Sequence, residues 1–235
     1  MPVLIRNSQT YTKDISPTTH TLTVPACNVG DLLIGCLTAT RLAGGSITPP
    51  AGWNLIRYQN TTSPSFPTGA VNVSYRIATA EDTSGAKTYD WKISSGQTAC
   101  GGIVALYQHD PANLVDAENG TFSSATNLVV APSVTTDVDD ALLLFVGGIV
   151  GTQTFTPPGD MTEVWDVASG GSFGTSQELA YQGLAASGAT GTRTATASGA
   201  ARNCGVLVAI GVAAVASDRS GLSGLSGLSG LSGIA

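Results

Sequence analysis

Three stretches of this chain are apolar at consecutive positions, with no alternation between two faces. They span 31–39, 141–149 and 204–215. A strand with one face in water alternates apolar and polar residues, so these runs predict strands that are covered on both faces. The cover has to be a loop, the other half of the chain or another subunit. Obligate subunit interfaces have this apolar character, and a trimer accounts for the excess apolar surface.

The clearest alternation runs over 70–78, where Val71, Val73 and Tyr75 face one side and Asn72 and Ser74 face the other. No window has the period of a helix, so we expect an all-β chain. Further strands are expected at 2–6, 20–24, 53–58, 87–93 and 101–107, and then near 127–131, 161–167, 177–185 and 192–198.

A set of short motifs occurs twice, in the same order and at nearly constant spacing. An acidic residue precedes an apolar strand, a double-proline turn follows, and an apolar strand beginning with cysteine closes each set. The motif residues are Asp31, Pro49, Pro50, Gly52 and Trp53 in the first set, and Asp140, Pro157, Pro158 and Gly159 in the second. The repetition predicts a duplicated supersecondary unit.

The duplication sets the expected organisation. Residues 1–216 form the head, with repeat one at about 20–107, a connection at 108–126 and repeat two at about 127–215. Twelve or so short strands at regular spacing are typical of a sandwich or barrel. We expect one antiparallel β-sandwich of jelly-roll type built from two similar halves, with two separate small sandwiches as the alternative.

The last segment, 217–235, differs from the head in composition. Gly-Leu-Ser triplets place glycine at every third position, which is the rule for a collagen triple helix. The run is short and has no proline, so a trimeric head would have to hold the three chains in register. A flexible linker or an expression scar is the alternative. The glycines that define the phase are Gly221, Gly224, Gly227, Gly230 and Gly233.

Composition and charge exclude several classes of function. Only 11% of the 235 residues are charged, and the net charge is −6. Ten scattered Lys and Arg residues form no basic stripe, so nucleic acid is not an expected partner. The N-terminus lacks the pattern of a secretory signal, and the longest apolar run is too short for a membrane span. We therefore expect a soluble protein made in a cytoplasm.

Candidate chemistry is sparse, and no cofactor is expected. Gly170 to Gly174 matches the G-x-S-x-G of a nucleophile elbow at Ser172, but no histidine follows it and no helix is expected after it, so we interpret it as a glycine-rich loop. The only histidines are His20 and His109, too few for a triad or a histidine-rich metal site. A hydrolase using Ser172 remains an alternative.

Acidic, aromatic and sulfur side chains offer three more hypotheses. Asp137, Asp139 and Asp140 precede a buried strand and are interpreted as a solvated turn, with calcium binding as the alternative. The tryptophans Trp53, Trp91 and Trp165 are expected in the core or at its rim, with sugar stacking as the alternative. Cys100 and Cys204 begin equivalent strands and are expected to be buried free thiols. A Cys27–Cys36 disulfide is not expected in a cytoplasmic protein.

The motifs together resemble a pattern seen in virion proteins of tailed phages and in phage-related bacterial proteins. The resemblance rests on the segments 30–34, 47–53, 75–78, 103–106 and 110–111, and the Gly-Leu-Ser run is similar to collagen-like runs of phage fibres and head-decorating proteins. Met161 stands where the first repeat has Trp53, a departure from the pattern.

The resemblance implies a non-enzymatic structural protein of a phage particle, either a capsid decoration (cement) protein or a head fibre. It would be a homotrimer on the virion surface, assembled in the host cytoplasm and seated on the major capsid protein, with no nucleic acid or membrane partner. The alternative is a tail-fibre or adhesin module that binds host-surface glycans.

Overall fold

The computed structural model describes residues 2–15, 17–41, 45–61, 68–95, 97–171 and 173–212, and all sheet pairings between its strands are antiparallel. The expected all-β class is confirmed. The one helical element among these residues is a short 3-10 turn, η1 (Asp82–Ser84). The strands of the first half are β1 (Leu4–Lys13), β2 (Thr19–Thr23), β3 (Leu32–Arg41), β4 (Ile47–Thr48), β5 (Asn54–Asn60), β6 (Thr68–Ile77), β7 (Thr88–Ile93) and β8 (Ala99–Tyr107). Those of the second half are β9 (Ala117–Ala131), β10 (Thr135–Thr136), β11 (Leu142–Val150), β12 (Phe155–Thr156), β13 (Thr162–Ala168), β14 (Thr175–Gly183), β15 (Gly188–Ala189) and β16 (Arg193–Ile210).

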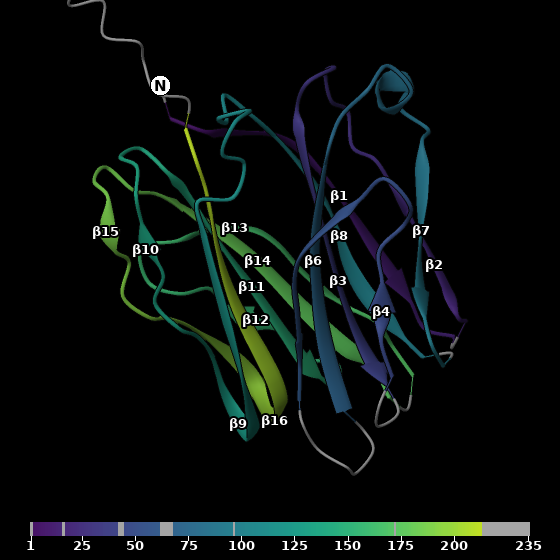
Figure 1. The fold of residues 1–235 in the computed structure, drawn as a ribbon. Coiled ribbons are helices and arrows are strands. Elements are labelled where there is room, and N and C mark those ends of the chain that lie inside the picture. The colour runs from purple at the N-terminus through teal and green to yellow at the C-terminus, as the bar shows by residue number, and fades with distance from the viewer. Residues whose placement is uncertain are drawn as a thin grey trace, which may run out of the picture.

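Each half of the chain builds one large sheet and a small outer layer. The first large sheet has the order β1-β8-β3-β6-β5, and its small sheet has the order β2-β7-β4. In the second half, β16 pairs with β9 and with β11, followed by β14 and β13, and the small pairs are β10-β15 and β12-β16. Figure 1 shows the two large sheets in the middle, with β2, β7 and β4 on one side and β10 and β15 on the other.

The two large sheets agree in register as well as in order. Leu32 pairs with Ile77 and Leu106, and Leu142 pairs with Gly183 and Ile210, which makes Leu32 and Leu142 equivalent positions. Both sheets also have an irregularity at the same place in the outermost hairpin, one residue after Leu55 in β5 and one residue after Glu163 in β13.

The large sheets pack face to face, and equivalent strands of the two halves make equivalent contacts. β5 lies against β9 and β1 against β13, while β3 contacts β14 and β6 contacts β11. Exchanging every element with its equivalent in the other half reproduces the same set of contacts. The halves are therefore related by an approximate two-fold axis, as the subunits of a symmetric dimer would be.

Each edge of this sandwich is joined by a polar contact between the halves. At the β5–β9 edge, Arg57 donates to Glu118 at 2.9 Å and to the carbonyl oxygen of Gly120 at 3.0 Å. At the β1–β13 edge, the amide of Gly170 donates to Asp14 at 2.6 Å. Gln177 adds a contact inside the sandwich through its 2.8 Å bond to Thr38.

The apolar core has three layers, which explains why some strands are apolar on both faces. The central layer lies between the large sheets and includes Ile34, Val73, Leu144 and Val208. Two outer layers lie between each large sheet and its own small sheet. All nine residues of β11 are buried within the single chain. Of the three covers that the sequence allowed, a loop, the other half of the chain or another subunit, contacts within the chain supply the one for β11, and this strand gives no support to a trimer.

Several predicted element boundaries were wrong for identifiable reasons. β1 runs to Lys13 through a polar stretch, because it is an edge strand with most of its side chains in solvent. The connection between the halves is short, since β9 begins at Ala117 and continues through the expected Asn119–Gly120 turn. A Cβ added at Gly120 would lie 2.8 Å from Nε of Arg57, so a larger residue there would displace the Arg57 side chain. The segments 192–198 and 204–210 belong to one strand, β16, which is irregular between Thr196 and Asn203.

Candidate functional site

The double-proline motifs form a matched pair of turns at the ends of the large sheets. The amide of Trp53 donates to the carbonyl oxygen of Pro50 at 3.1 Å, and Met161 makes the same bond to Pro158 at 3.1 Å. The third turn residue has a positive φ in both cases, Gly52 at 81° and Asp160 at 64°. Gly159 therefore precedes the left-handed position, and Asp160 is the counterpart of Gly52. These turns orient strands and hold no reactive group.

The acidic motif residues are not equivalent to each other. The counterpart of Asp140 in the first half is Gly30. Each of the two residues lies two positions before the first residue of its buried strand, and each has a positive φ. Asp31 corresponds to Ala141 and has a structural role of its own. Its carboxylate accepts two bonds from the Arg6 guanidinium, at 2.6 and 3.1 Å, and one from the amide of Asn28 at 2.7 Å. This bidentate pair fixes the start of β1 to the start of β3.

The acidic turn before β11 is held by hydrogen bonds to the protein. The amide of Asp137 donates to Asp116 at 2.9 Å, and Asp139 accepts from the amide of Ser187 at 2.7 Å. Hydrogen bonds from Ser187 lower the pKa of Asp139. No group of three or more His, Cys, Asp or Glu side chains in the described ranges is arranged to hold a metal ion. The geometry therefore gives the calcium hypothesis no support.

All three tryptophans are buried, so none can act as an exposed sugar platform. Trp91 is completely buried, and Trp53 and Trp165 are 6% and 4% exposed. Trp53 and Trp91 pack edge to face at 4.9 Å between ring centroids. The indole of Trp91 donates to Asn72 at 3.3 Å, and that of Trp165 donates to Gln177 at 3.1 Å. The core interpretation of the tryptophans is confirmed.

The glycine-rich loop that contains the G-x-S-x-G string joins β13 to β14. Ser172 itself lies outside the described residues. The flanking backbone is bound by the first half, since Gly170 donates to Asp14, and Thr40 donates to the carbonyl oxygen of Phe173 at 3.0 Å. A strand both precedes and follows this loop, so the strand–turn–helix context of a nucleophile elbow is missing.

The two histidines lie in different surroundings. His20 is fully buried and bonds to the Tyr11 hydroxyl at 3.0 Å and to the carbonyl oxygen of Pro17 at 3.2 Å. Burial lowers the pKa of His20 to about 4. His109 follows β8, whereas the loop at Gly170 lies near the start of β8, where Cys100 contacts Thr175. His109 therefore lies at the other end of β8 from this loop, and the ring nitrogens of His20 are already bonded to Tyr11 and Pro17.

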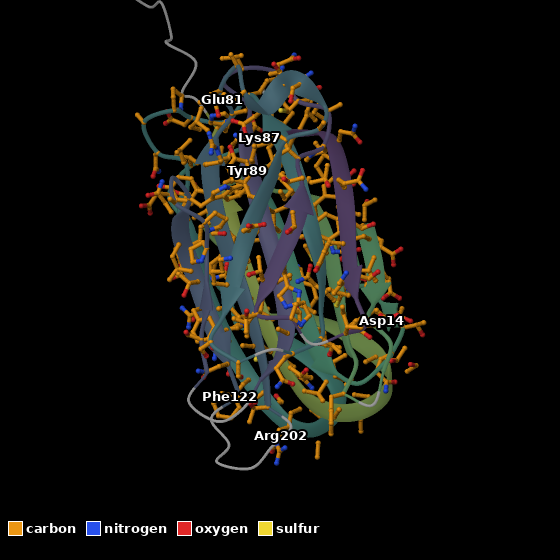
Figure 2. All side chains as sticks on the ribbon, turned by 90° about the vertical axis from the view of Figure 1, so that its right-hand side faces the viewer. Asp14, Glu81, Lys87, Tyr89, Phe122 and Arg202 are labelled. Carbon is orange, nitrogen blue, oxygen red and sulfur yellow. The ribbon has the colours of Figure 1, made fainter. Side chains whose placement is uncertain are left out.

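One polar centre that the sequence did not reveal surrounds Asp82, at the start of η1. Its buried carboxylate accepts bonds from Tyr89 at 2.6 Å, from Arg76 at 3.0 Å and from the amide and hydroxyl groups of Thr79. Burial acts to raise the pKa of Asp82, but the hydrogen bonds and Arg76 outweigh it and the net shift is downward. Figure 2 shows Tyr89 near Glu81 and Lys87 at one end of the molecule. The Asp82 carboxylate is saturated with donors and closed off from solvent, so we interpret the centre as one that fixes this end of the molecule.

A second unforeseen feature is an open groove of about 380 Å³ beside the connection between the halves. Leu55, Ile56 and Tyr75 form one wall, and residues 111–115 form the other, with Glu118 at the rim. In this groove the Leu55 side chain is 51% exposed. The other end of the molecule is a separate surface, where Phe122 and Arg202 lie (Figure 2). The lining mixes apolar side chains with Asn113, Tyr75 and Glu118, and the described residues place no titratable pair suited to catalysis in the groove.

The third is Glu178 on β14, a buried carboxyl group in which neither oxygen has a hydrogen-bond partner. Burial raises the pKa of Glu178 to about 9, and the nearby Glu163 and Asp166 raise it further. Glu178 is the register equivalent of Asn72 in the first half, an equivalence that the strand pairings reveal.

Comparison with known proteins gives no family for this chain. No family model, no curated protein sequence and no solved structure matches it. In the part of the chain that the structure describes, no helix is long and apolar enough to cross a membrane.

Proposed function

We propose that this chain is a non-enzymatic structural component of a phage particle, a capsid decoration (cement) or head-fibre protein carried on the virion surface. The sequence supports this through the motifs that resemble phage virion proteins and through the Gly-Leu-Ser run. The protein would be made in the host cytoplasm and would seat on the major capsid protein. Its action would be passive, through contacts spread over neighbouring capsid subunits.

The proposal includes the architecture of the head. We infer that each half is a jelly roll and that the two halves arose by duplication. The order β1-β8-β3-β6 opposite β2-β7-β4 has the alternation between two sheets that defines this fold, and the second large sheet repeats it in order and register. Jelly rolls are typical of viral capsid domains and of lectin domains.

One observation carries the structural role: the described chain ends at one pole of a closed head. β16 ends at Ile210, and Val212 bridges to His109 at the end of the molecule that holds the connection between the halves. The Gly-Leu-Ser run follows within a few residues. A run that continued outward from Val212 would leave the head at this pole. The opposite end remains available for a seat on another surface.

The trimer in this proposal rests on the Gly-Leu-Ser run alone. Three such runs would wind around one another with their glycines at the axis, and three heads would then stand at one end of the bundle. The three long apolar strands give no argument for this association, because the described part of each chain buries them itself.

The direct test is the location of the protein in particles. Mass spectrometry of purified virions, followed by an electron-microscopy map, is expected to find the chain in multiple copies at symmetric positions on the capsid. Its absence from particles would contradict the proposal. Specific binding of the purified protein to host glycans, lost on changing Tyr75 to alanine in the open groove, would favour the adhesin alternative.

A further inference from the structure

Glu178 occupies an unusual position on the outer face of the second large sheet. Its neighbours on that face are Asp166, directly opposite on β13, Gly147, opposite on β11, and Ser176 and Ala180, two residues away along β14. The side chain is completely buried. Neither carboxyl oxygen has a hydrogen-bond partner, an arrangement that costs free energy in any protein interior.

The segment that covers this face is attached on two sides of Glu178. The amide of Gln153 donates to the Ser176 hydroxyl at 2.7 Å, and the amide of Phe155 donates to Asp166 at 2.8 Å. Phe155 belongs to β12, which pairs with the first part of β16. Residues 153–156 are therefore held across the outer layer next to Glu178. A change in the charge of that carboxyl group would act on this covering segment.

The charged groups that act on Glu178 all have the same sign. They are Asp166 and Glu163 on β13, and both carboxylates disfavour a second negative charge beside them. The residues that face it from β11, from β14 and from the cover are uncharged. With a pKa of about 9, the group keeps its proton at neutral pH.

The first half shows that the fold does not require an acid here. Asn72 holds the equivalent position on β6 and is also fully buried. It accepts a bond from the indole of Trp91 at 3.3 Å and donates to the carbonyl oxygen of Ile47 at 3.4 Å. Ile47 lies in β4, the counterpart of β12, so an uncharged amide secures this cover. The two halves thus differ in how their outer layers respond to proton loss.

We propose that Glu178 is a proton-controlled lock on the outer layer of the second half: the neutral carboxyl group permits residues 153–156 to close over the sheet, and its ionisation releases them. The covering segment of the first half, over Asn72, has no such control.

Hydrogen exchange on the full-length protein tests the lock, with the first half as an internal reference. Protection of residues 153–156 is compared with that of residues 46–48 from pH 6 to pH 9, so that the intrinsic effect of pH on exchange cancels. The open state releases one proton that the closed state keeps. The ratio of protection is therefore expected to fall by up to about tenfold for each pH unit. Glu178→Gln replaces the ionisable carboxyl group with an amide that does not titrate. In this variant we expect the ratio of protection to be independent of pH. Glu163→Gln removes a neighbouring carboxylate and leaves Glu178 in place. It is expected to retain the dependence on pH, with the upper end of the dependent range at a lower pH because one repelling charge is gone.

The wild-type measurement decides the matter even where a variant fails to fold. Equal pH dependence of the two segments in the wild type would overturn the lock, and so would a pH-dependent ratio that survives in Glu178→Gln.

Discussion

Gly35 lies directly against the ring of Trp91: a Cβ added to this glycine would be 2.6 Å from Cζ2 of the indole and 2.9 Å from Cζ3 of Trp53. The second half fills the same volume from the other side. Phe145 is the register equivalent of Gly35, and Ala195 is the equivalent of Trp91 by the pairing of β4 and β12 with their partners. In the first half the sheet has the small residue and the cover has the large one, and in the second half the sheet has the large residue and the cover has the small one. Both outer cores are closely packed in this way.

Gly35→Ala is expected to destabilise the protein by about 2 kcal/mol or more, because the new methyl group has to displace two packed indoles. Gly159→Ala is the matched control. Its φ is outside the left-handed region and nothing lies within 4 Å of the added carbon, so we expect a change within about 0.5 kcal/mol. Urea unfolding of the two variants measures both values. Equal stability of the two variants would contradict the packing described for the first half.

Truncation of Trp53 tests whether the tryptophans have a structural role. Trp53→Ala is expected to cost about 3–5 kcal/mol, the range typical of a buried aromatic side chain. Leu55→Ala, two residues away on an exposed side chain, is expected to cost less than about 1 kcal/mol. A Trp53→Ala protein of unchanged thermal stability would show that the indole does not support the core.

The pH dependence of stability should reveal His20. Burial lowers its pKa to about 4, so between about pH 4 and 6.5 the unfolded chain binds a proton that the folded protein does not. This term therefore makes stability rise with pH across that window, by up to about 1.4 kcal/mol per unit, and it is constant above the window. His20→Gln removes the term. The difference in unfolding free energy between wild type and variant is expected to grow from pH 4 to 6.5 and then stay level. A constant difference from pH 4 to 7 would contradict the burial of a neutral imidazole.

The four cysteines are free and buried. We expect their thiols to react only slowly with reagents in the native protein. Burial raises the pKa of Cys36 and Cys100, and each sulfur lies in a closed core. A thiol reagent at pH 8 is expected to modify Cys36 and Cys100 no faster than the protein unfolds, and to modify all four thiols at once in urea. Cys27, at 8% exposure, would be the first to react. Rapid native reaction of Cys100 would show that the two halves separate.

Much of the fold could be predicted from the sequence because the strands are long and their patterns differ. The apolar run at 141–149 and the alternation at 70–78 correspond to β11 and β6 within a few residues. The repeated order of motifs predicted two similar halves, and the two large sheets have corresponding strand orders. The sequence left the cover of the apolar faces open between a loop, the other half of the chain and another subunit, because strands of two residues such as β4 and β12 have no sequence pattern. The sequence alone cannot distinguish a cover of this kind from a partner subunit.

The buried acidic centres were missed for a related reason. Glu178 falls on the polar side of an alternating strand, which ordinarily faces water. Only the arrangement of 153–156 shows that this side is closed. Asp82 follows a turn and looks like a solvated residue until Tyr89 and Arg76 are placed around it. In both cases the signal depends on residues that are distant in sequence or on comparison with the other half.

The central claim is that each chain completes its own head and that only the Gly-Leu-Ser run joins copies. Native mass measurement of the full 23.7 kDa chain and of a chain ending at Val212 tests it most directly. We expect a trimer for the full chain and a folded monomer for the shortened one. A full chain that stays monomeric, or a shortened chain that remains trimeric, would contradict the claim.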